Sequence, residues 1–523
     1  MTVLKPDAGG VPAVMTRADR ASGPVAIIEV APAELNAVTA ELAEHPGARL
    51  ADLFAAGTDP VSLRTVWALD RDQLYLITET KVDGPRYPAL SDIVPAAFTE
   101  ECEIYEQFGI RPTGSKPLNR VAMPPQADIE LPRLGRAPAE APQDVHAPHV
   151  VGGQAFEFPF GPVRQVGVES LYYGLVTSGE ELVDLYLFTW HKHRGVEWRA
   201  QGQTPHQALF HIERAEGLGA VGNSCAFATA AEAALGLDPE PEALATRAIA
   251  LELERLYNHA AAIAAMCQAC GLAVGRAAAE IALEQFLRLN AAVLGHRYLF
   301  GVVEIGGGRT APDVARLRAD LPAAYGELRR AGDALLSTNS LLDRLEATGT
   351  VTFEEARRLG LVGPVGRASG VGADARADHP SGAYVALAPV VATRTEGDAL
   401  ARMRVMLAEV AESVRLIDAL ATPDDRGRPP GGGQRDSADP AETPIRADDG
   451  GRRCGLGWAE SSRGESLAWV ELGPDGRISR ARLRPAAVRN WRGFDDACRS
   501  QNVFTDIPII EASFWLTVAG TAR

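Results

Sequence analysis

One long helical pattern constrains the fold more than any other feature of the sequence. In residues 245–267, ATRAIALELERLYNHAAAIAAMC, apolar side chains recur every three or four positions and form a single stripe: Ile249, Leu253, Leu256, Ala260 and Ile263. This spacing predicts an α-helix with one face that must be buried against other elements. Residues 280–300, EIALEQFLRLNAAVLGHRYLF, have a similar helical pattern. The middle of the chain, about residues 205–345, is therefore predicted to be a helical bundle.

A smaller domain is predicted before this bundle. Residues 24–121 alternate short apolar runs such as VAIIEV with helix-like stretches, which is typical of an α/β domain. The prolines of residues 122–150 favour an extended linker, and residues 1–23 are predicted to be a flexible N-terminus. The expected fold class is thus α+β: a small α/β domain, then a large, mainly helical domain over residues 151–523 that begins with a β-hairpin region.

The large domain contains one strongly polar segment. Residues 422–453 are rich in Pro, Gly and charge, so burial cannot offset the entropy of ordering them. They are predicted to be a disordered surface insertion. After them, residues 466–484, SLAWVELGPDGRISRARLR, predict two strands around a Pro-Asp-Gly turn.

Charge and cysteine content exclude several classes of protein. A formal net charge of -16 argues against a nucleic-acid partner, because such binding depends on Lys and Arg. No run approaches the roughly 18–20 apolar residues of a membrane-spanning helix, so any membrane contact is expected through partner subunits. The 6 cysteines are too scattered for a disulfide framework, which favours a reducing cytoplasm.

A motif in the small domain resembles the C subunit of NADH:quinone oxidoreductase (complex I). Residues 101–120, ECEIYEQFGIRPTGSKPLNR, contain acidic residues, then FGI, then a Gly, Pro, Leu and Arg pattern. Ser115 stands where that family commonly has a histidine. The matching residues are Glu103, Glu106, Phe108, Gly109, Ile110, Gly114, Pro117, Leu118 and Arg120.

The rest of the chain resembles the D subunit of complex I and the large subunits of energy-converting nickel-iron hydrogenases of the hydrogenase-4 and formate hydrogenlyase kind. The resemblance rests on ordered blocks, since each block alone is a weak signal. The blocks are GPV at 161, HRGVEW at 193, ALELERLYNH at 250, LVGPVGRASGV at 361, GDALARMRVMLAEVAES at 397 and SSRGES at 461. A C-type domain followed by a D-type domain also resembles the fused chains of such systems.

The resemblance places the metal ligands of the hydrogenases at four positions that lack cysteine here. A nickel-iron centre is held by four thiolates in two CxxC pairs. The first pair corresponds to Glu216 and Gly219, and the second to Thr517 and Gly520. No metal is therefore expected. An active hydrogenase with unusual ligands is the least favoured alternative, because these residues cannot replace soft sulfur ligands.

Complex I D subunits hold a quinone headgroup in the corresponding cavity, between a Tyr and a His. The Tyr position corresponds to Gly217, and the hairpin 161–170, GPVRQVGVES, contains no His. Quinone thus remains a candidate ligand of this degenerate cavity, but both of its characteristic partners are missing.

Polar residues near this cavity are candidates for catalysis or proton relay. In HRGVEW, His193 titrates near neutral pH and Glu197 could orient it, with Arg194 beside them. Alternatively, this block fixes the junction between hairpin and helix through ion pairs.

Two further pairs follow from the resemblance. Arg463 could bind an anionic or carbonyl oxygen, with Glu465 after it, or it could simply neutralise buried carboxylates. Asp374 and Arg376 lie in a glycine-rich loop and are expected to order the cavity mouth.

Two groups on predicted helices receive a structural interpretation. Glu252, Arg255 and His259 share one helix face, which is expected to be solvated; the alternative is that it lines the cavity or meets a partner subunit. Cys267 and Cys270 are interpreted as helix cysteines in a buried setting rather than as a metal site.

The resemblance implies a subunit of a membrane-associated complex, peripheral on the cytoplasmic face of the cell membrane. Electrons would pass from an iron-sulfur small subunit towards quinone or another acceptor, with membrane-arm subunits as further partners and no nickel-iron centre in this chain. Oxidoreductase activity would belong to the NADH dehydrogenase-like complex as a whole. No glycine-rich phosphate cradle follows a predicted strand, so NAD binding by this chain is not expected. The alternative is a non-catalytic scaffold.

Overall fold

The structure is a computed structural model. The predicted N-terminal segment, proline-rich linker and polar insertion lie largely outside the described residues, and so does much of hairpin 161–170. The described residues are 2–4, 24–57, 60–114, 116–124, 133–140, 142, 155–163, 169–308, 310–422, 453–499 and 502–523.

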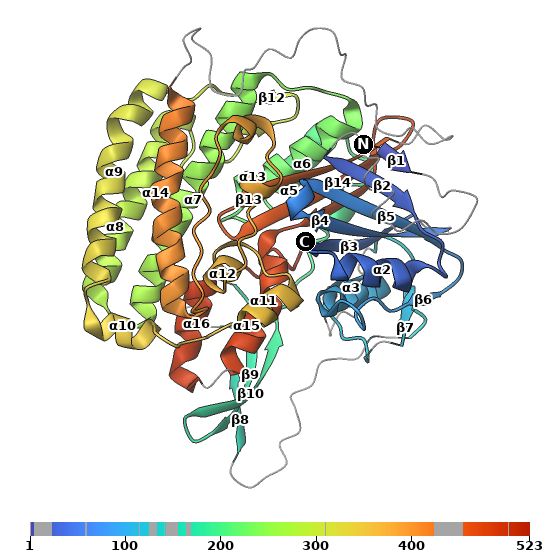
Figure 1. Cartoon of the computed structure of the whole chain (residues 1–523), viewed down its shortest axis with the longest axis horizontal. Coiled ribbons are helices and arrows are strands. Elements are labelled where there is room, and N and C mark those ends of the chain that lie inside the picture. Colours follow the sequence, from blue (N-terminus) through green and yellow to red (C-terminus); the bar gives the residue numbers. More distant parts are fainter. Residues whose placement is uncertain are drawn as a thin grey trace.

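The N-terminal domain is a five-stranded sheet with helices on one face (Figure 1). Successive strand residues point to opposite faces, so Ala26 and Ile28 pack against the helices while Val25 and Ile27 face the other way. The two helices are α2 (Leu35–Glu44) and α3 (Phe98–Phe108). In spatial order the strands are β1 (Thr2–Leu4), β2 (Val25–Glu29), β5 (Leu74–Val82), β4 (Val61–Leu69) and β3 (Ala48–Ala56), and a two-stranded sheet is formed by β6 (Arg86–Pro88) and β7 (Arg111–Thr113).

A three-stranded antiparallel sheet joins the two domains. Its apolar residues Leu456 and Trp469 pack on the free face of the N-terminal sheet. On the other side it lies against α6 (Ala220–Leu235), and this approach requires glycine: a Cβ on Gly457 would lie 2.1 Å from the carbonyl oxygen of Ala226. The strands are β13 (Arg453–Ser461), β14 (Gly464–Leu472) and β15 (Ile478–Arg484).

Long helices form a bundle beyond α6 (Figure 1). Its long members are α7 (Pro241–Ala269), α8 (Ala273–Leu294), α9 (Val314–Leu335) and α14 (Ala399–Ala421). The shorter elements of this domain are α4 (Val196–Ala200), α5 (Pro205–Glu213), β11 (Val303–Glu304), β12 (Gly307–Gly308), α10 (Asn339–Leu345), α11 (Phe353–Leu359), α12 (Gly363–Ala368), α13 (Ala375–Asp378), α15 (Ala486–Arg499) and α16 (Ile507–Phe514). The predicted α+β class with a helical bundle is confirmed.

A small sheet projects from the body of the molecule (Figure 1). Leu171, Tyr173 and Leu185 at its base pack with Phe494 of α15 and Phe514 of α16, which anchors it. Its strands are β8 (Phe156–Phe160), β9 (Tyr172–Ser178) and β10 (Glu181–Phe188). Within the described ranges, no helix has the length and apolar character needed to cross a membrane.

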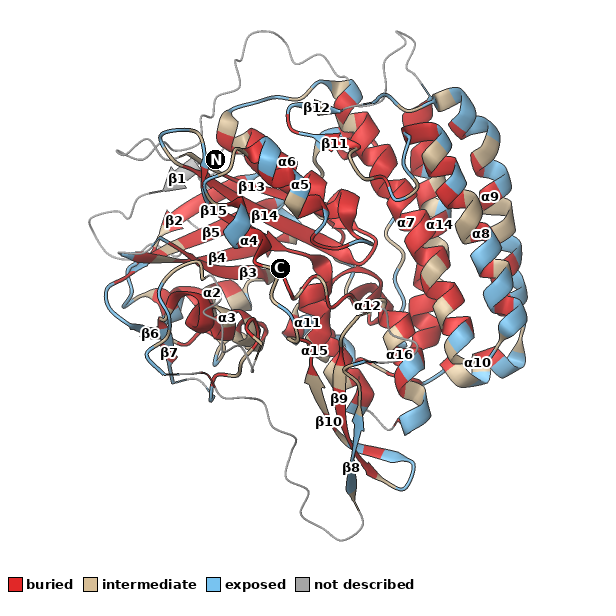
Figure 2. Cartoon of the chain, turned by 180° about the vertical axis from the view of Figure 1, so that it is seen from behind, coloured by how far each residue is buried: buried red, intermediate tan, exposed pale blue. Residues whose placement is uncertain are grey.

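The prediction of a solvated polar face on α7 is wrong. Glu252 and Arg255 are 0% exposed and His259 is 1% exposed, and most of α7 is buried (Figure 2). The reason is that α7 lies in the centre of the domain, where charged groups from distant parts of the chain meet this face. Buried charges are tolerated when they are paired.

Candidate functional site

Of the four positions that the resemblance assigns to hydrogenase metal ligands, three lie around the carboxylate of the fourth, Glu216. Thr517 Oγ1 donates a hydrogen bond of 2.6 Å to Glu216 Oε1. A Cβ on Gly219 would lie 3.1 Å from Glu216 Oε2, and a Cβ on Gly520 would lie 3.6 Å from the same oxygen. The loop before α6 and the segment after α16 therefore meet at Glu216. A Cβ on Gly217, the residue that the resemblance places at the quinone Tyr position, would have no other atom within 4 Å.

Arg463 fills the centre of this site. It lies in the turn between β13 and β14, is 3% exposed, and places Nη1 3.3 Å from Glu216 Oε1. Its other donors reach the carbonyl of Leu218 at 3.1 Å, the carbonyl of Trp515 at 2.5 Å and Asn258 Oδ1 at 3.3 Å. All three donor nitrogens of the guanidinium are thus used by groups of the protein itself.

Trp515 closes the site from the C-terminal side. Its indole Nε1 donates to Asn258 Oδ1 at 3.1 Å, and its φ of 52° lies in the left-handed region that bulky residues rarely adopt. The strained backbone is held because the Trp515 carbonyl and indole are bound from two sides. Asn223 of α6 also contributes, since its Nδ2 donates to Glu216 Oε2 at 3.3 Å.

A second carboxylate, Glu254, lies beside this pair and was not singled out from the sequence. It accepts hydrogen bonds from the backbone amides of Val221 at 2.8 Å and Gly222 at 3.0 Å, in the first turn of α6. Burial raises the pKa of Glu254 to about 7, although these bonds and the nearby Arg463 oppose the shift. The helical pattern predicted that Glu254 lies on α7, but no feature of the sequence near it indicates that its side chain binds the first turn of α6.

The residues present do not fit a nickel-iron centre. The site offers a carboxylate, a hydroxyl and two glycines, and soft metals of this kind need sulfur. Cys225 lies on α6, and burial raises the pKa of its thiol to about 12, so it stays protonated. In the part of the chain that the structure describes, no group of three or more His, Cys, Asp and Glu side chains is arranged to hold a metal ion.

The HRGVEW block lies beside this site and is held by ion pairs. Arg194 donates to the carbonyls of Ala215 and Ala519, which directly precede Glu216 and Gly520 in the chain. Glu197 pairs with Arg480 at 2.8 Å and with Arg523 at 3.0 Å. Burial alone would raise the pKa of Glu197, but the charges of Arg480, Arg482 and Arg523 outweigh it and lower it to about 2. This geometry favours the structural interpretation of the block.

His193 lies in a small gap between the two domains. Among the described residues, neither of its ring nitrogens has a hydrogen-bond partner, and burial lowers its pKa. The imidazole is therefore neutral at pH 7. Glu197 makes no hydrogen bond to it, because the Glu197 carboxylate is paired with Arg480 and Arg523.

Glu465 faces the N-terminal domain instead of Arg463. It accepts hydrogen bonds from Arg484 at 2.5 Å, from Tyr75 at 3.1 Å and from Arg49. Burial would raise the pKa of Glu465, but Arg49 and Arg484 lower it to about 2. It is an interdomain contact.

Asp374 and Arg376 also lie away from Glu216. Asp374 caps α13 by accepting from the Arg376 amide at 3.0 Å, and the Arg376 guanidinium pairs with Asp374 at 2.7 Å and with Glu252 at 3.0 Å. Both are at most 2% exposed. They belong to a different group of buried charges, which links α13 to Glu252 of α7.

Comparison with known proteins agrees with this two-domain arrangement. Residues 28–140 match the family "Respiratory-chain NADH dehydrogenase, 30 Kd subunit", and residues 280–428 match "Respiratory-chain NADH dehydrogenase, 49 Kd subunit". The chain fuses a 30-kDa and a 49-kDa domain of the complex I family. The resemblance to C and D subunits is therefore confirmed.

Relatives of this fused 30/49-kDa chain include components of hydrogenases. Formate hydrogenlyase subunit 5 of Escherichia coli is 28% identical over 83% of this chain and 76% of its own length. Hydrogenase-4 component G of the same organism is 25% identical over 84% and 77%. The C/D subunit of the NADH-quinone oxidoreductase of Phocaeicola vulgatus is 25% identical over 83% and 86%.

A solved structure has the same fold. A chain of the archaeal membrane-bound sulfane sulfur reductase, a respiratory membrane complex, aligns with a TM-score of 0.62 over 71% of this chain and 99% of its own length, at 22% identity.

Proposed function

We propose that this chain is a structural subunit of a membrane-bound redox complex of the complex I or hydrogenase type. The observation that carries the proposal is the Glu216 site: of the four positions that the resemblance assigns to sulfur ligands, two are glycines and the other two, Glu216 and Thr517, bind one another. Thr517 and Arg463 both engage the Glu216 carboxylate, so the protein fills its own cavity. The relatives named as subunits or components of larger enzymes support assembly with partners.

In such an assembly the redox groups belong to neighbouring subunits. Electrons would pass from an iron-sulfur small subunit to an acceptor, with this chain peripheral on the cytoplasmic face and joined to the membrane through membrane-arm subunits. This chain would hold the iron-sulfur subunit and the membrane-arm subunits in fixed positions relative to each other. Its acidic surface, with a net charge of -16, suits contact with basic partner surfaces.

A second candidate function is electron transfer to quinone or another acceptor at Arg463. It is favoured by the two guanidinium groups, Arg194 and Arg463, that point to the carbonyls around Glu216 and could turn to a quinone oxygen instead. The acceptor would have to displace hydrogen bonds that are already satisfied.

Isolation of the complex through a tag on this chain distinguishes these functions. Nickel, bound quinone and the rate of acceptor reduction would be measured for the wild type, for Thr517→Val and for Thr521→Val as a control in the same segment. A structural role predicts no stoichiometric nickel, and an acceptor-reduction rate and quinone-analogue inhibition that neither variant changes. A change in quinone-analogue inhibition in Thr517→Val alone would support the second candidate, and stoichiometric nickel would refute both.

A further inference from the structure

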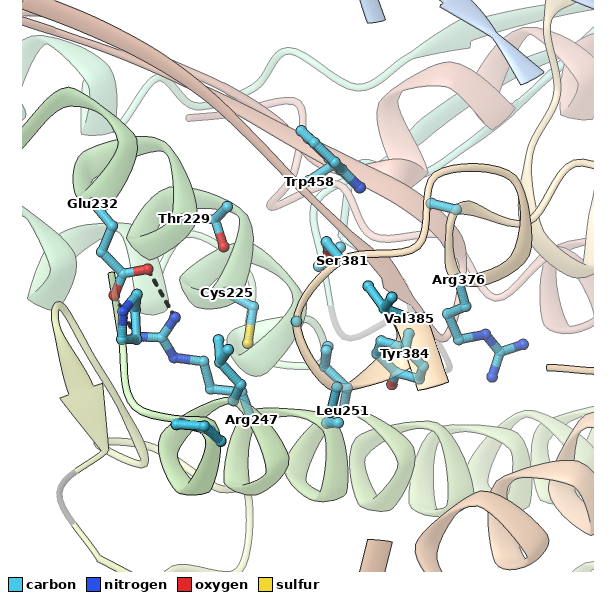
Figure 3. Close-up of a pocket in the computed structure, with 18 of the residues that line it drawn as sticks. Cys225, Thr229, Glu232, Arg247, Leu251, Arg376, Ser381, Tyr384, Val385 and Trp458 are labelled. Atoms are coloured by element: carbon cyan, nitrogen blue, oxygen red, sulfur yellow. Dashed lines mark hydrogen bonds and ion pairs between the residues drawn. The ribbon is translucent and has the colours of Figure 1, made fainter. Parts of the chain in front are cut away.

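A cavity of about 610 Å³ opens away from the Glu216 site, between α6, α7 and the loop that follows α13 (Figure 3). Leu244 and Leu251 of α7 form part of its wall, with Tyr384 from the loop. Trp458 and Glu460 reach it from β13. Glu460 is only 3% exposed, and it lies inside the protein except where it lines this cavity. The cavity therefore gives solvent a route to Glu460.

Behind Glu460 lies a group of ion-paired side chains, which we call the buried charge cluster. Its carboxylates are Glu252, Asp374, Glu409 and Glu460, and its bases are Arg255, His259, Arg367 and Arg376. Every member is at most 3% exposed. The cluster joins α7, α12, α13, α14 and β13, which are far apart in the sequence.

Arg367 is the hub of the cluster. It lies 2.8 Å from Glu409, 2.8 Å from Glu460 and 3.3 Å from Asp374. Arg376 pairs with Asp374 at 2.7 Å and with Glu252 at 3.0 Å. These contacts make the cluster one connected network.

The rest of the network runs along α7. Arg255 lies 3.2 Å from Glu252 and 3.7 Å from Glu409, and His259 Nε2 lies 2.8 Å from Glu409. Arg255 also donates to the carbonyls of Glu460 and Ser461 at 2.8 Å each. Those two residues are the last of β13 and are followed by the turn that contains Arg463. The end of β13 therefore contacts the cluster, and the turn after it contacts Glu216.

The charges of this cluster do not balance. Four carboxylates face three guanidinium groups, and His259 is kept neutral because burial lowers its pKa. A net charge among side chains that are this buried is unfavourable, and a bound proton removes it. The connected network therefore has room for one proton.

Glu460 is the carboxylate of the cluster with the fewest guanidinium partners. Glu252 pairs with Arg255 and Arg376, and Asp374 and Glu409 each have two arginines within ion-pair distance as well. The Glu460 carboxylate pairs with Arg367 at 2.8 Å and otherwise accepts a hydrogen bond from the neutral Ala375 amide at 3.1 Å. The proton that would balance the charge of the cluster is therefore best placed on the Glu460 carboxylate.

Charged and titratable groups face Glu460 from every side. Burial raises the pKa of Glu460 to about 7, Asp374 adds to the shift, and Arg367, Arg255 and Arg376 oppose it. The groups on the elements packed around it are Glu252, Arg255 and His259 on α7, Arg367 on α12, Asp374 and Arg376 on α13, Glu409 on α14, Tyr384 after α13, and Cys225 on α6.

We propose that the buried charge cluster is a proton-binding site, which takes up one proton on the Glu460 carboxylate and exchanges it with solvent through the cavity. Protonation forms one O–H bond and neutralises the cluster, and release leaves a single negative charge beside the strand end that leads to Arg463. No electron is transferred within the cluster. If the chain has the structural function proposed above, a change of charge on a neighbouring subunit would shift this equilibrium and so couple the chain to its partners.

Infrared difference spectroscopy of the intact complex tests this site, because a protonated carboxyl group has a C=O stretch separate from that of a carboxylate. Raising the pH through neutrality should remove the band of Glu460 in the wild type, together with those of other buried carboxyl groups such as Glu254, and deuterium oxide should shift them. Glu460→Gln should lack the Glu460 band and keep the others. Glu240→Gln, a matched change at the cavity wall, should keep them all.

Two further variants serve as controls. One distinguishes loss of the proton site from misfolding, and the other tests whether the proton is bound by His259 instead. Glu460→Asp keeps a titratable carboxyl and should move the Glu460 band rather than delete it. His259→Gln should leave the band in place. Identical spectra for the wild type and Glu460→Gln would overturn the proposal, and so would loss of the band in His259→Gln.

Discussion

Removal of Arg463 should destabilise the chain strongly. In Arg463→Met the Glu216 carboxylate, which is as buried as its partner, keeps only the Thr517 hydroxyl and the Asn223 amide as donors among the described residues. Breaking a buried ion pair by removing one partner costs about 3–5 kcal/mol, because an uncompensated charge is left behind. The carbonyls of Leu218 and Trp515 lose a donor as well.

The assay is denaturant unfolding of the purified chain, with two comparison variants. Arg477→Met removes an arginine with a half-exposed side chain that lies 3.9 Å from Asp475, and an exposed pair is worth about 0–1 kcal/mol. Glu216→Gln combined with Arg463→Met removes the stranded charge, so it should recover part of the loss. Equal destabilisation by Arg463→Met and Arg477→Met, or no recovery in the double variant, would refute the idea that the Glu216 site is an internal ion pair.

Other predictions concern pH dependence and packing. Because the pKa of Glu254 is raised by burial from 4.5 to about 7, its stabilising contribution is fully present below about pH 4.5 and is lost as the pH rises through about 7. Glu254→Gln should therefore flatten the fall of the unfolding midpoint over that range, and an unchanged slope would contradict the assignment. Gly457→Ala should cost on the order of 1–3 kcal/mol or more, because its Cβ would lie 2.1 Å from a carbonyl of α6, whereas Gly217→Ala meets nothing within 4 Å and should leave the melting temperature nearly unchanged.

Local patterns in the sequence were sufficient for individual elements. The stripe from Ile249 to Ile263 predicted α7, and the Pro-Asp-Gly turn predicted the connection of β14 to β15. Both signals depend on neighbours within a few positions, which a sequence displays directly. The strand β13 was not predicted, since its glycines and polar residues are explained only by the helix that covers it.

Polar contacts could not be predicted in the same way. Glu252 finds its partner Arg376 at a separation of 124 residues, and Arg49 reaches Glu465 at a separation of 416. An amphipathic helix whose polar face meets such partners is indistinguishable, by periodicity, from one whose polar face meets water. The family resemblance identified the positions around Glu216, but their side-chain chemistry had to be found in the structure.

The sheet of β13, β14 and β15 has a consequence for how this chain could be handled. Its residues make buried bonds to the first domain, among them Arg482 with Asp52 at 2.9 Å and Glu471 with Arg64 at 3.0 Å, around an apolar contact centred on Trp469. A protease cut between the domains would therefore leave a nicked but undivided particle. The noncovalent contacts of this sheet would be sufficient to hold the two domains together. The main effect of the covalent fusion would then be that both domains are synthesised in equal amounts.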